Sequence, residues 1–230
     1  MGTPKVQTLR KKAQSVDEVL TRLYGRQDVD QVADPLDTLV ETILSQNTTD
    51  ANSHRCFRSL KKAYPNWNRI LDEDPTTIAS IIRSGGLADI KAERILAALN
   101  FIKRKRGRLE LDFLRDKTPS EADEWLSRIK GVGPKTRGIV LLFSLEMPAF
   151  PVDTHIHRVT KRLGLIGPRV SREKAQHELA LLVPSREYYS FHINLIQHGR
   201  MVCHPRKPEC VMCKISRYCD FYSGTSRTQT

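Results

Sequence analysis

The sequence predicts an all-α protein. Apolar residues recur three and four positions apart through most of the chain, which is the spacing of one helix face. No segment shows the strict alternation of apolar and polar residues that marks a half-buried strand. At 230 residues the chain suits one domain or two small ones, and no repeat or low-complexity linker divides it. We expect disorder only at the ends, about residues 1–5 and 222–230.

Helical spacing begins in residues 36–44, where the apolar positions form one continuous stripe. The next such segment contains Cys56 on its apolar stripe, so we expect this cysteine to lie in the core. Tyr188, Tyr189 and Phe191 are likewise expected to pack within a helix. The remaining predicted helices cover 52–64, 76–83, 89–105, 120–129, 134–146, 155–163, 171–183 and 186–198.

The charge balance is strongly basic, with 38 Lys and Arg against 26 Asp and Glu, a net charge of +12. A pI near 9.7 favours a polyanionic partner, nucleic acid first and an anionic membrane surface second. No apolar run approaches the roughly 18–20 residues that cross a bilayer, and the first residues lack the apolar stretch of a signal peptide. We therefore expect an intracellular protein of the cytoplasm or nucleoid, without a membrane partner.

Four of the five cysteines fall in one short segment near the C-terminus. In a reducing compartment, cysteines clustered in this way bind metal more often than they form disulfides. Their spacing leaves structural zinc and an iron–sulfur cluster equally open. Arg206 and Lys207 lie between the first two cysteines, where they could meet phosphates or simply be solvated. The predicted ligands are Cys203, Cys210, Cys213 and Cys219.

A glycine-rich turn separates the predicted helices 120–129 and 134–146. Ser120 is expected to begin the first helix, with Asp123 as its capping-box partner. Gly131 and Gly133 allow a tight turn with outward-facing amides, and Pro134 suits the first position of the second helix. This pattern predicts a helix-hairpin-helix, whose amides and helix N-terminus bind a DNA phosphate without reading sequence. An ordinary corner between two helices is the alternative.

Two chemistry-bearing residues flank the helix after this turn. Lys135 lies in its first turn, where the helix dipole disfavours the charged form of an amine. Asp153 lies eighteen residues later and precedes an apolar-periodic helix, so it is a natural N-cap. The chain could bring the two together as a nucleophile and an electrostatic partner, although a phosphate-binding lysine and a simple cap would explain each alone. His155 and His157 cannot share a helix face, so we interpret them as helix or DNA-facing residues rather than metal ligands.

Taken together, these motifs resemble endonuclease III, a family of the helix-hairpin-helix DNA glycosylase superfamily. The resemblance rests on Lys130-Gly-Val-Gly-Pro-Lys-Thr136, Val152-Asp-Thr-His155 and the terminal cysteines, in this order, and covers about residues 15–221. Shorter matches are Leu44-Ser-Gln-Asn-Thr-Thr-Asp50, Gly86-Leu87 with Lys91-Ala92, and His198-Gly-Arg200.

The resemblance implies two all-α domains that hold duplex DNA in the groove between them. One would be a six-helix barrel over 27–147 that ends with the hairpin. The other would join residues 1–26 to 148–230 and carry a [4Fe–4S] cluster on the four cysteines of loop 203–219. The protein would act as a monomer on DNA that contains a damaged base or an abasic site.

The resemblance also implies the chemistry. Lys135 would attack C1′ of a nucleotide flipped from the duplex, Asp153 would stabilise the developing positive charge, and a Schiff base would lead to β-elimination 3′ to the site. Substrates would be oxidised pyrimidines such as thymine glycol. Asn47 and Leu87 would fill the vacated stack, with Gln46 sharing the role because the family usually has Gln where this chain has Asn47. Lys130 also departs from the usual Pro. The DNA contacts implied are Gln46, Asn47, Leu87, Gly131, Gly133, Thr136, His155, Arg206 and Lys207.

Three other functions remain open from the sequence. A monofunctional mismatch glycosylase usually lacks a lysine at the hairpin position, so Lys135 argues against it. A non-catalytic DNA-binding protein would use the hairpin as a clamp and would keep its activity without Lys135. A zinc-stabilised interaction module would lack the absorption near 400 nm of an iron–sulfur protein.

Overall fold

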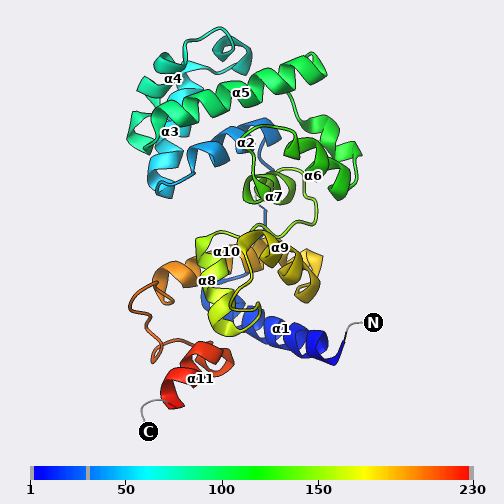
Figure 1. Ribbon diagram of the computed structural model, residues 1–230, viewed down its shortest axis with the longest axis vertical. Coiled ribbons are helices and arrows are strands. Elements are labelled where there is room, and N and C mark those ends of the chain that lie inside the picture. Colours follow the sequence, from blue (N-terminus) through cyan, green and yellow to red (C-terminus); the bar gives the residue numbers. More distant parts are fainter. Residues whose placement is uncertain (1–2, 30–31, 228–230) are drawn as a thin grey trace. The chain divides into compact units, whose positions relative to one another are not determined.

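The computed structural model of the protein describes residues 3–29 and 32–227, and within these it consists of helices, turns and loops without a strand. The predicted all-α class is therefore confirmed. The chain divides into two compact units (Figure 1). Unit 1 combines Met1–Asp30 with Pro148–Thr230, and unit 2 is Gln31–Met147. In the described part of the chain, no helix is both long and apolar enough to span a membrane.

Unit 2 is built around α2, which packs against α3, α5 and α7. Its apolar side chains, among them Leu39, Val40 and Ile43, are almost completely buried because neighbours cover it on several sides. A buried hydrogen bond from Ser144 Oγ to Thr38 Oγ1 joins the end of α7 to α2. The helices of this unit are α2 (Pro35–Leu44), α3 (Asp50–Ala63), α4 (Pro75–Ile81), α5 (Ala88–Arg106), α6 (Pro119–Ser127) and α7 (Pro134–Phe143), with short 3-10 turns η1 (Trp67–Ile70), η2 (Arg83–Gly85) and η3 (Asp112–Asp116).

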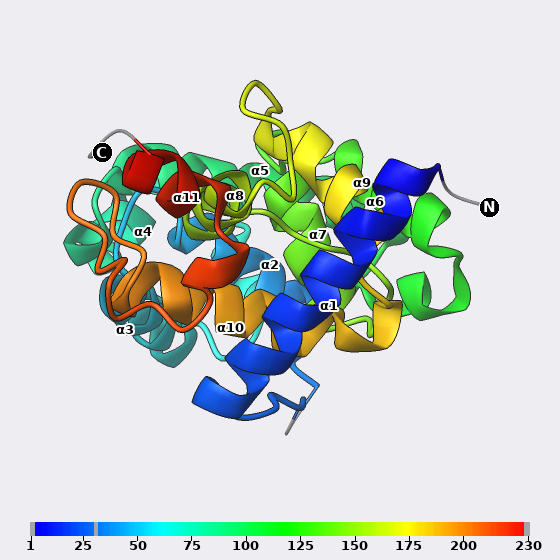
Figure 2. The same ribbon diagram turned by 90° about the horizontal axis from the view of Figure 1, so that it is seen from below.

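In unit 1, segments from both ends of the chain pack together. The N-terminal helix α1 lies against α9 and α10, and α8 packs between α10 and α11 (Figure 2). Asn194 Nδ2 donates to Gly25 O at 3.1 Å, and Lys12 forms a 2.6 Å ion pair with Asp220. The elements are α1 (Pro4–Tyr24), α8 (Thr154–Leu163), α9 (Arg172–Leu182), η4 (Ser185–Glu187), α10 (Tyr188–Met201), η5 (Ser216–Tyr218) and α11 (Asp220–Arg227).

Several predicted boundaries need correction. The capping box of α6 is formed by Thr118 and Glu121, not by Ser120 and Asp123, because Pro119 takes the first helical position. Asp123 instead accepts a 2.7 Å hydrogen bond from Arg137 Nε of α7. The helix after the hairpin ends at Phe143 rather than at residue 146, and Glu146 has a left-handed backbone with φ of 54°.

The predicted disorder at the ends was also wrong for most of those residues. α1 begins at Pro4, and α11 extends to Arg227. Residues 1–2 and 228–230 lie outside the described part of the chain. The predicted core positions are confirmed for Cys56, Tyr188 and Phe191, whereas Tyr189 is only partly buried.

Candidate active site and nucleic-acid interface

The turn between α6 and α7 has the geometry expected of a hairpin. Gly131 has φ of +85°, in the left-handed region that costs other residues about 1–2 kcal/mol. Ile129 and Val132 are buried and anchor the turn, so that the two glycines between and after them stay exposed. Gly133 is the N-cap of α7, and Pro134 occupies the first helical position as predicted. The turn therefore presents backbone amides to solvent at a helix N-terminus, where anions bind.

Lys135 and Thr136 follow directly in the first turn of α7. The Lys135 side chain is exposed. The Thr136 side chain is only 4% exposed and packs inside unit 2, so its hydroxyl does not face solvent. The backbone N–H of Thr136 can still donate to a phosphate, because the first amides of a helix have no intrahelical acceptor.

Two further loops of unit 2 carry residues with strained backbone. Asn47 follows the end of α2 with φ of 52°, and Leu87 precedes α5 with φ of 53°. For residues other than glycine this region is sparsely populated, and such strain clusters at functional sites. Leu87 is also 49% exposed, so much of this large apolar side chain is open to solvent. Gln46, next to Asn47, accepts a hydrogen bond from Arg94 Nη1 of α5.

In unit 1, Asp153 is the N-cap of α8, as predicted. Its Oδ1 accepts a 2.8 Å hydrogen bond from the Ile156 amide, which leaves Oδ2 outside the cap. Val152, which precedes it, is buried and fixes the start of the helix. His155 lies against α10 so closely that a Cβ on Gly199 would meet the His155 Cβ at 2.9 Å. His157 lies 2.8 Å, through Nε2, from the Val170 carbonyl oxygen and so contacts its own unit.

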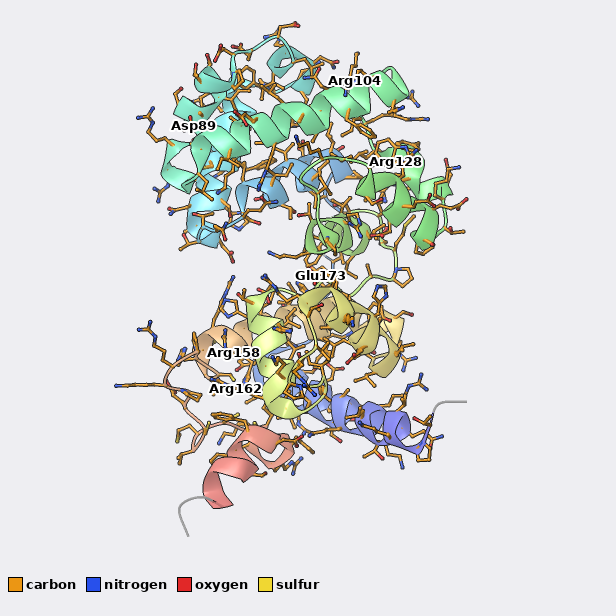
Figure 3. All side chains as sticks on the ribbon, in the orientation of Figure 1. Asp89, Arg104, Arg128, Arg158, Arg162 and Glu173 are labelled. Carbon is orange, nitrogen blue, oxygen red and sulfur yellow. The ribbon has the colours of Figure 1, made fainter. Side chains whose placement is uncertain are left out.

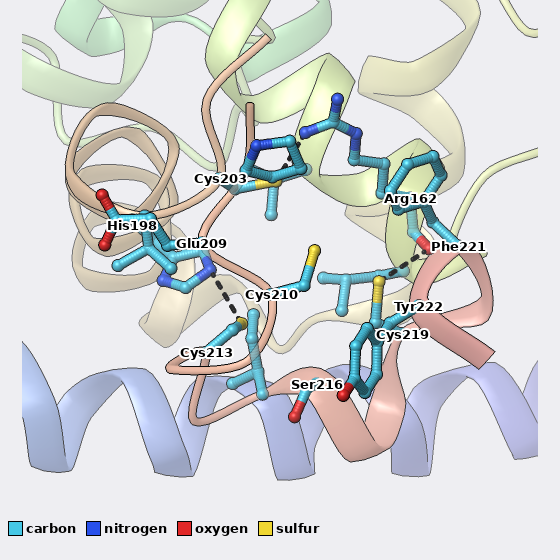
Figure 4. A pocket seen from close by; sticks show the side chains of 15 residues that line it. Arg162, His198, Cys203, Glu209, Cys210, Cys213, Ser216, Cys219, Phe221 and Tyr222 are labelled. Carbon is cyan, nitrogen blue, oxygen red and sulfur yellow. Dashed lines mark hydrogen bonds between the residues drawn. The ribbon is translucent and has the colours of Figure 1, made fainter. Parts of the chain in front are cut away.

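The four clustered cysteines line one pocket (Figure 4). All four are free thiols. Burial raises the pKa of Cys213 to about 11, and repulsion from the other three thiolates adds to this. Burial also raises the pKa of Cys219. Four ionised sulfurs would therefore need a bound cation, which is the chemistry of a metal or cluster site. Among the described residues, no three His, Cys, Asp or Glu side chains are arranged to share one ion.

The sequence analysis missed two arginines that connect this pocket to α8. Arg162 Nη1 donates to Cys203 Sγ at 3.2 Å and to His204 O at 2.7 Å. Arg158, one turn earlier, donates through Nε to Cys203 O at 2.9 Å and through Nη2 to Gly199 O at 2.8 Å. Figure 3 shows both side chains on successive turns of α8. Their spacing of four is the only sequence signal that could have singled them out.

His198 and the basic loop complete the surroundings of the pocket. His198 Nε2 lies 3.6 Å from Cys213 Sγ, and Nδ1 lies 3.1 Å from Tyr24 Oη of α1. Burial lowers the pKa of His198 to about 4, so the ring is neutral at pH 7. Arg206 and Lys207 are exposed on the loop between the first two cysteines.

Comparisons with known proteins first define the class. The sequence profile of the HhH-GPD superfamily base excision DNA repair proteins matches residues 40–185. A trapped endonuclease III–DNA covalent intermediate has the same fold, with a TM-score of 0.82 at 24% identity over 99% of this chain and 100% of that one. A thermostable thymine-DNA glycosylase aligns with a TM-score of 0.77 at 25% identity, over 95% and 98% of the two chains.

Curated proteins with similar sequences identify the family within this superfamily. Endonuclease III of Thermotoga maritima is 31% identical over 189 residues, which span 82% of this chain and 84% of that protein. Endonuclease III of Sulfolobus acidocaldarius is 35% identical over 80% and 81% of the two chains. A protein of Arabidopsis thaliana named as a DNA glycosylase is 41% identical over 75% of this chain but only 59% of its own length. The chain belongs to the endonuclease III family of base excision repair DNA glycosylases, and the predicted resemblance is confirmed.

Proposed function

We propose that the protein is a bifunctional DNA glycosylase and abasic-site lyase that removes oxidised pyrimidines of the thymine glycol type from duplex DNA. One observation carries the lyase part of this proposal. An exposed lysine, Lys135, occupies the first turn of the helix that follows the hairpin. A primary amine can form a Schiff base with C1′ of the sugar. A glycosylase that uses water as its nucleophile does not need such an amine.

In the proposed reaction, the neutral Nζ of Lys135 attacks C1′, and the bond to the base breaks with its electron pair leaving on the base. The attached amine then loses a proton, and its lone pair breaks the C1′–O4′ bond of the sugar, whose oxygen takes up a proton, to give an iminium (Schiff base). The iminium loses a proton from C2′, and the electron pair of that C–H bond expels the 3′ phosphate. Asp153 would stabilise the positive charge that develops on the sugar. The hydrogen bond from Ile156 to Asp153 Oδ1 supports this role, because it fixes the carboxylate in one orientation before the substrate arrives.

DNA would be held mainly through its backbone. The net charge of +12 and the exposed amides around Gly131 and Gly133 support phosphate binding without sequence preference. Arg206, Lys207 and His155 are further proposed DNA contacts. The strained Asn47 and Leu87, which we call the wedge residues, would enter the stack when the damaged nucleotide is flipped, with Gln46 beside them. We also propose that the two domains, 27–147 and 1–26 with 148–230, correspond to units 2 and 1, except that unit 1 extends to Asp30.

The four cysteines would hold a [4Fe–4S] cluster. The pocket supports this reading, because it gathers four free thiols whose ionisation a cationic cluster would stabilise. In a cluster each thiolate binds a different iron, so the sulfurs need not converge on one ion as they do for tetrahedral zinc. When bound, the cluster would cross-link the segment 203–219. Absorption near 400 nm distinguishes it from zinc.

Borohydride trapping tests the proposed function. On a duplex with one thymine glycol, we expect the protein to form a covalent DNA adduct that Lys135→Gln does not form. Lys130→Gln is the matched control, because it removes an exposed lysine from the same hairpin and should still be trapped. An adduct that persists in Lys135→Gln would refute this lysine as nucleophile. No adduct with the unsubstituted protein, combined with base release from a mismatched duplex, would instead identify a monofunctional glycosylase.

A further inference from the structure

Unit 2 buries a lysine that the proposed chemistry does not use. Lys91 lies on the second turn of α5 and is only 1% exposed. Its Nζ donates to Leu44 O at 2.7 Å and to Gly85 O at 2.8 Å. Burial lowers the pKa of this amine, and the nearby Cys56 opposes that effect. Lysines are almost never fully buried unless their charge is paired or hydrogen-bonded. Burying Lys91 therefore costs stability, and we expect a functional role to offset this cost.

The two carbonyls that Lys91 holds lie directly before the wedge residues. Leu44 is the last residue of α2, three positions before Asn47, and Gly85 ends η2, two positions before Leu87. The Lys91 backbone amide also donates to Leu87 O at 3.0 Å. One residue of α5 therefore binds the backbone leading into both strained positions.

The surroundings leave little room for another arrangement. A Cβ on Gly85 would meet Cys56 Sγ at 2.9 Å and Lys91 Nζ at 3.8 Å, so the turn before Leu87 is packed around the ammonium. Leu87 itself is 49% exposed, so about half of its surface is not packed against the protein. Lys91 Nζ binds the backbone at Gly85, two residues before Leu87, and so constrains how the chain enters this position.

The same face of α5 contacts a third segment. Arg94 lies three residues after Lys91, and its Nη1 donates to Gln46 Oε1 in the loop that contains Asn47. The Arg94 side chain also runs beside the hairpin, since a Cβ on Gly131 would meet Arg94 Cδ at 3.3 Å. Positions 87, 91 and 94 share one helix face because they are four and three residues apart.

We propose that Lys91 is a positioning residue for nucleotide flipping, which holds Leu87 and Asn47 in their strained backbone conformations so that both can enter the DNA stack together. This inference rests on the proposed function, in which these two residues fill the vacated stack. Lys91 would touch neither DNA nor the reacting atoms. Its removal would lower the population of flipped nucleotide while leaving phosphate binding through the hairpin in place.

A double-mutant cycle between Lys91 and Leu87 tests the proposal. The probe is a duplex with a tetrahydrofuran abasic analogue opposite 2-aminopurine, whose fluorescence reports when the opposite base is displaced from the stack. We expect Lys91→Met and Leu87→Ala each to lower the equilibrium constant for displacement about tenfold, a size typical of residues in one contact network. The double variant should lose clearly less than the product of the two single effects, because Lys91 acts in part through Leu87. Additive effects would overturn the proposal.

Two controls separate positioning from damage to the fold. Lys103→Met removes a lysine from the same helix, one that contacts Asn68 instead of the wedge loops, and should leave displacement unchanged. Circular dichroism melting checks that Lys91→Met folds; should it not fold, Lys91→Leu, which likewise removes the N–H donor, takes its place in the cycle. If Leu87→Ala alone has no effect, the wedge assignment fails and the Lys91 proposal falls with it. If Leu87→Ala lowers displacement and the folded Lys91 variant does not, only the Lys91 proposal is overturned.

Discussion

The hairpin of unit 2 is fixed by its own backbone, whereas the cysteine loop of unit 1 gathers four thiols that repel one another once ionised. In the hairpin, a left-handed glycine, a proline at the first helical position and two buried side chains define the turn. In the loop, Ile215 is the one buried apolar side chain of the segment 203–219, whereas Val211 and Met212 are 85% and 69% exposed, so apolar burial contributes little there. The backbone and packing of the hairpin therefore specify its turn by themselves, and we propose that this turn binds phosphate, while the structure of the cysteine loop depends on what the thiols bind.

The largest effect is expected from Cys213→Ser. Loss of one of the four proposed ligands should release the proposed [4Fe–4S] cluster and free the segment 203–219, while the hairpin keeps its structure. Hydrogen exchange should become about a thousandfold faster across this segment, equivalent to about 4 kcal/mol, and stay unchanged at residues 128–137. Cys56→Ala is the control, because this cysteine is buried in unit 2 and its loss should leave the absorption near 400 nm intact. Loss of protection in the hairpin as well would contradict the independence of the two regions.

Asp153→Asn separates the two roles of this residue. Asparagine caps a helix about as well as aspartate, so the melting temperature should change little. Turnover on thymine glycol should fall by at least about a hundredfold, since the negative charge is lost. Asp153→Ala should additionally cost about 1 kcal/mol of stability, because the 2.8 Å bond from Ile156 is removed. Near-normal turnover of the asparagine variant would leave Asp153 with only its capping role.

The two hairpin glycines offer a matched pair. Gly131→Ala should destabilise the turn by about 1–2 kcal/mol, because its φ is +85° and the new Cβ would lie 3.3 Å from Arg94 side-chain atoms. Gly133→Ala has open space around it and an ordinary φ of −81°, so we expect less than about 0.5 kcal/mol. Binding to undamaged duplex, measured by fluorescence anisotropy, should weaken about tenfold only in the first variant. Equal weakening in both variants would show that the φ of Gly131 does not control the interface.

Local signals predicted most of the fold and little of the long-range bonding. Apolar periodicity located α2 to α10 but not the two terminal helices α1 and α11, and turn chemistry identified the hairpin and the Asp153 cap, because each of these signals depends on neighbours in sequence. The cap of α6 was misplaced since Thr118 and Ser120 are both acceptable caps, and only Pro119 decides between them. Arg162 and Lys91 could not be assigned, because their bonds to the carbonyls of His204 and Leu44 reach 42 and 47 residues away, and a backbone carbonyl carries no side-chain signal. Such partners are fixed by packing rather than by periodicity.

The smallest effect is expected at Asp17 of α1, which lies in unit 1 away from the cysteines. Burial, reinforced by Glu187, raises the pKa of this carboxyl to about 6. Among the described residues, its Oδ1 is one of two buried side-chain oxygens without a hydrogen-bond partner. Folding therefore favours the protonated form, and stability is lost as the pH rises from about 4 through 6.

Asp17→Asn should thus stabilise the protein at pH 7.5 by about 1 kcal/mol, after allowance for solvent screening of a partly exposed group, and by little at pH 4.5. Thermal melting at the two pH values measures this difference. Glu18→Gln is the matched control, because Glu18 is an exposed neighbour on the same helix and its neutralisation should have no comparable effect. A gain of equal size at both pH values would mean that the asparagine makes a new contact and that the buried charge of Asp17 does not destabilise unit 1.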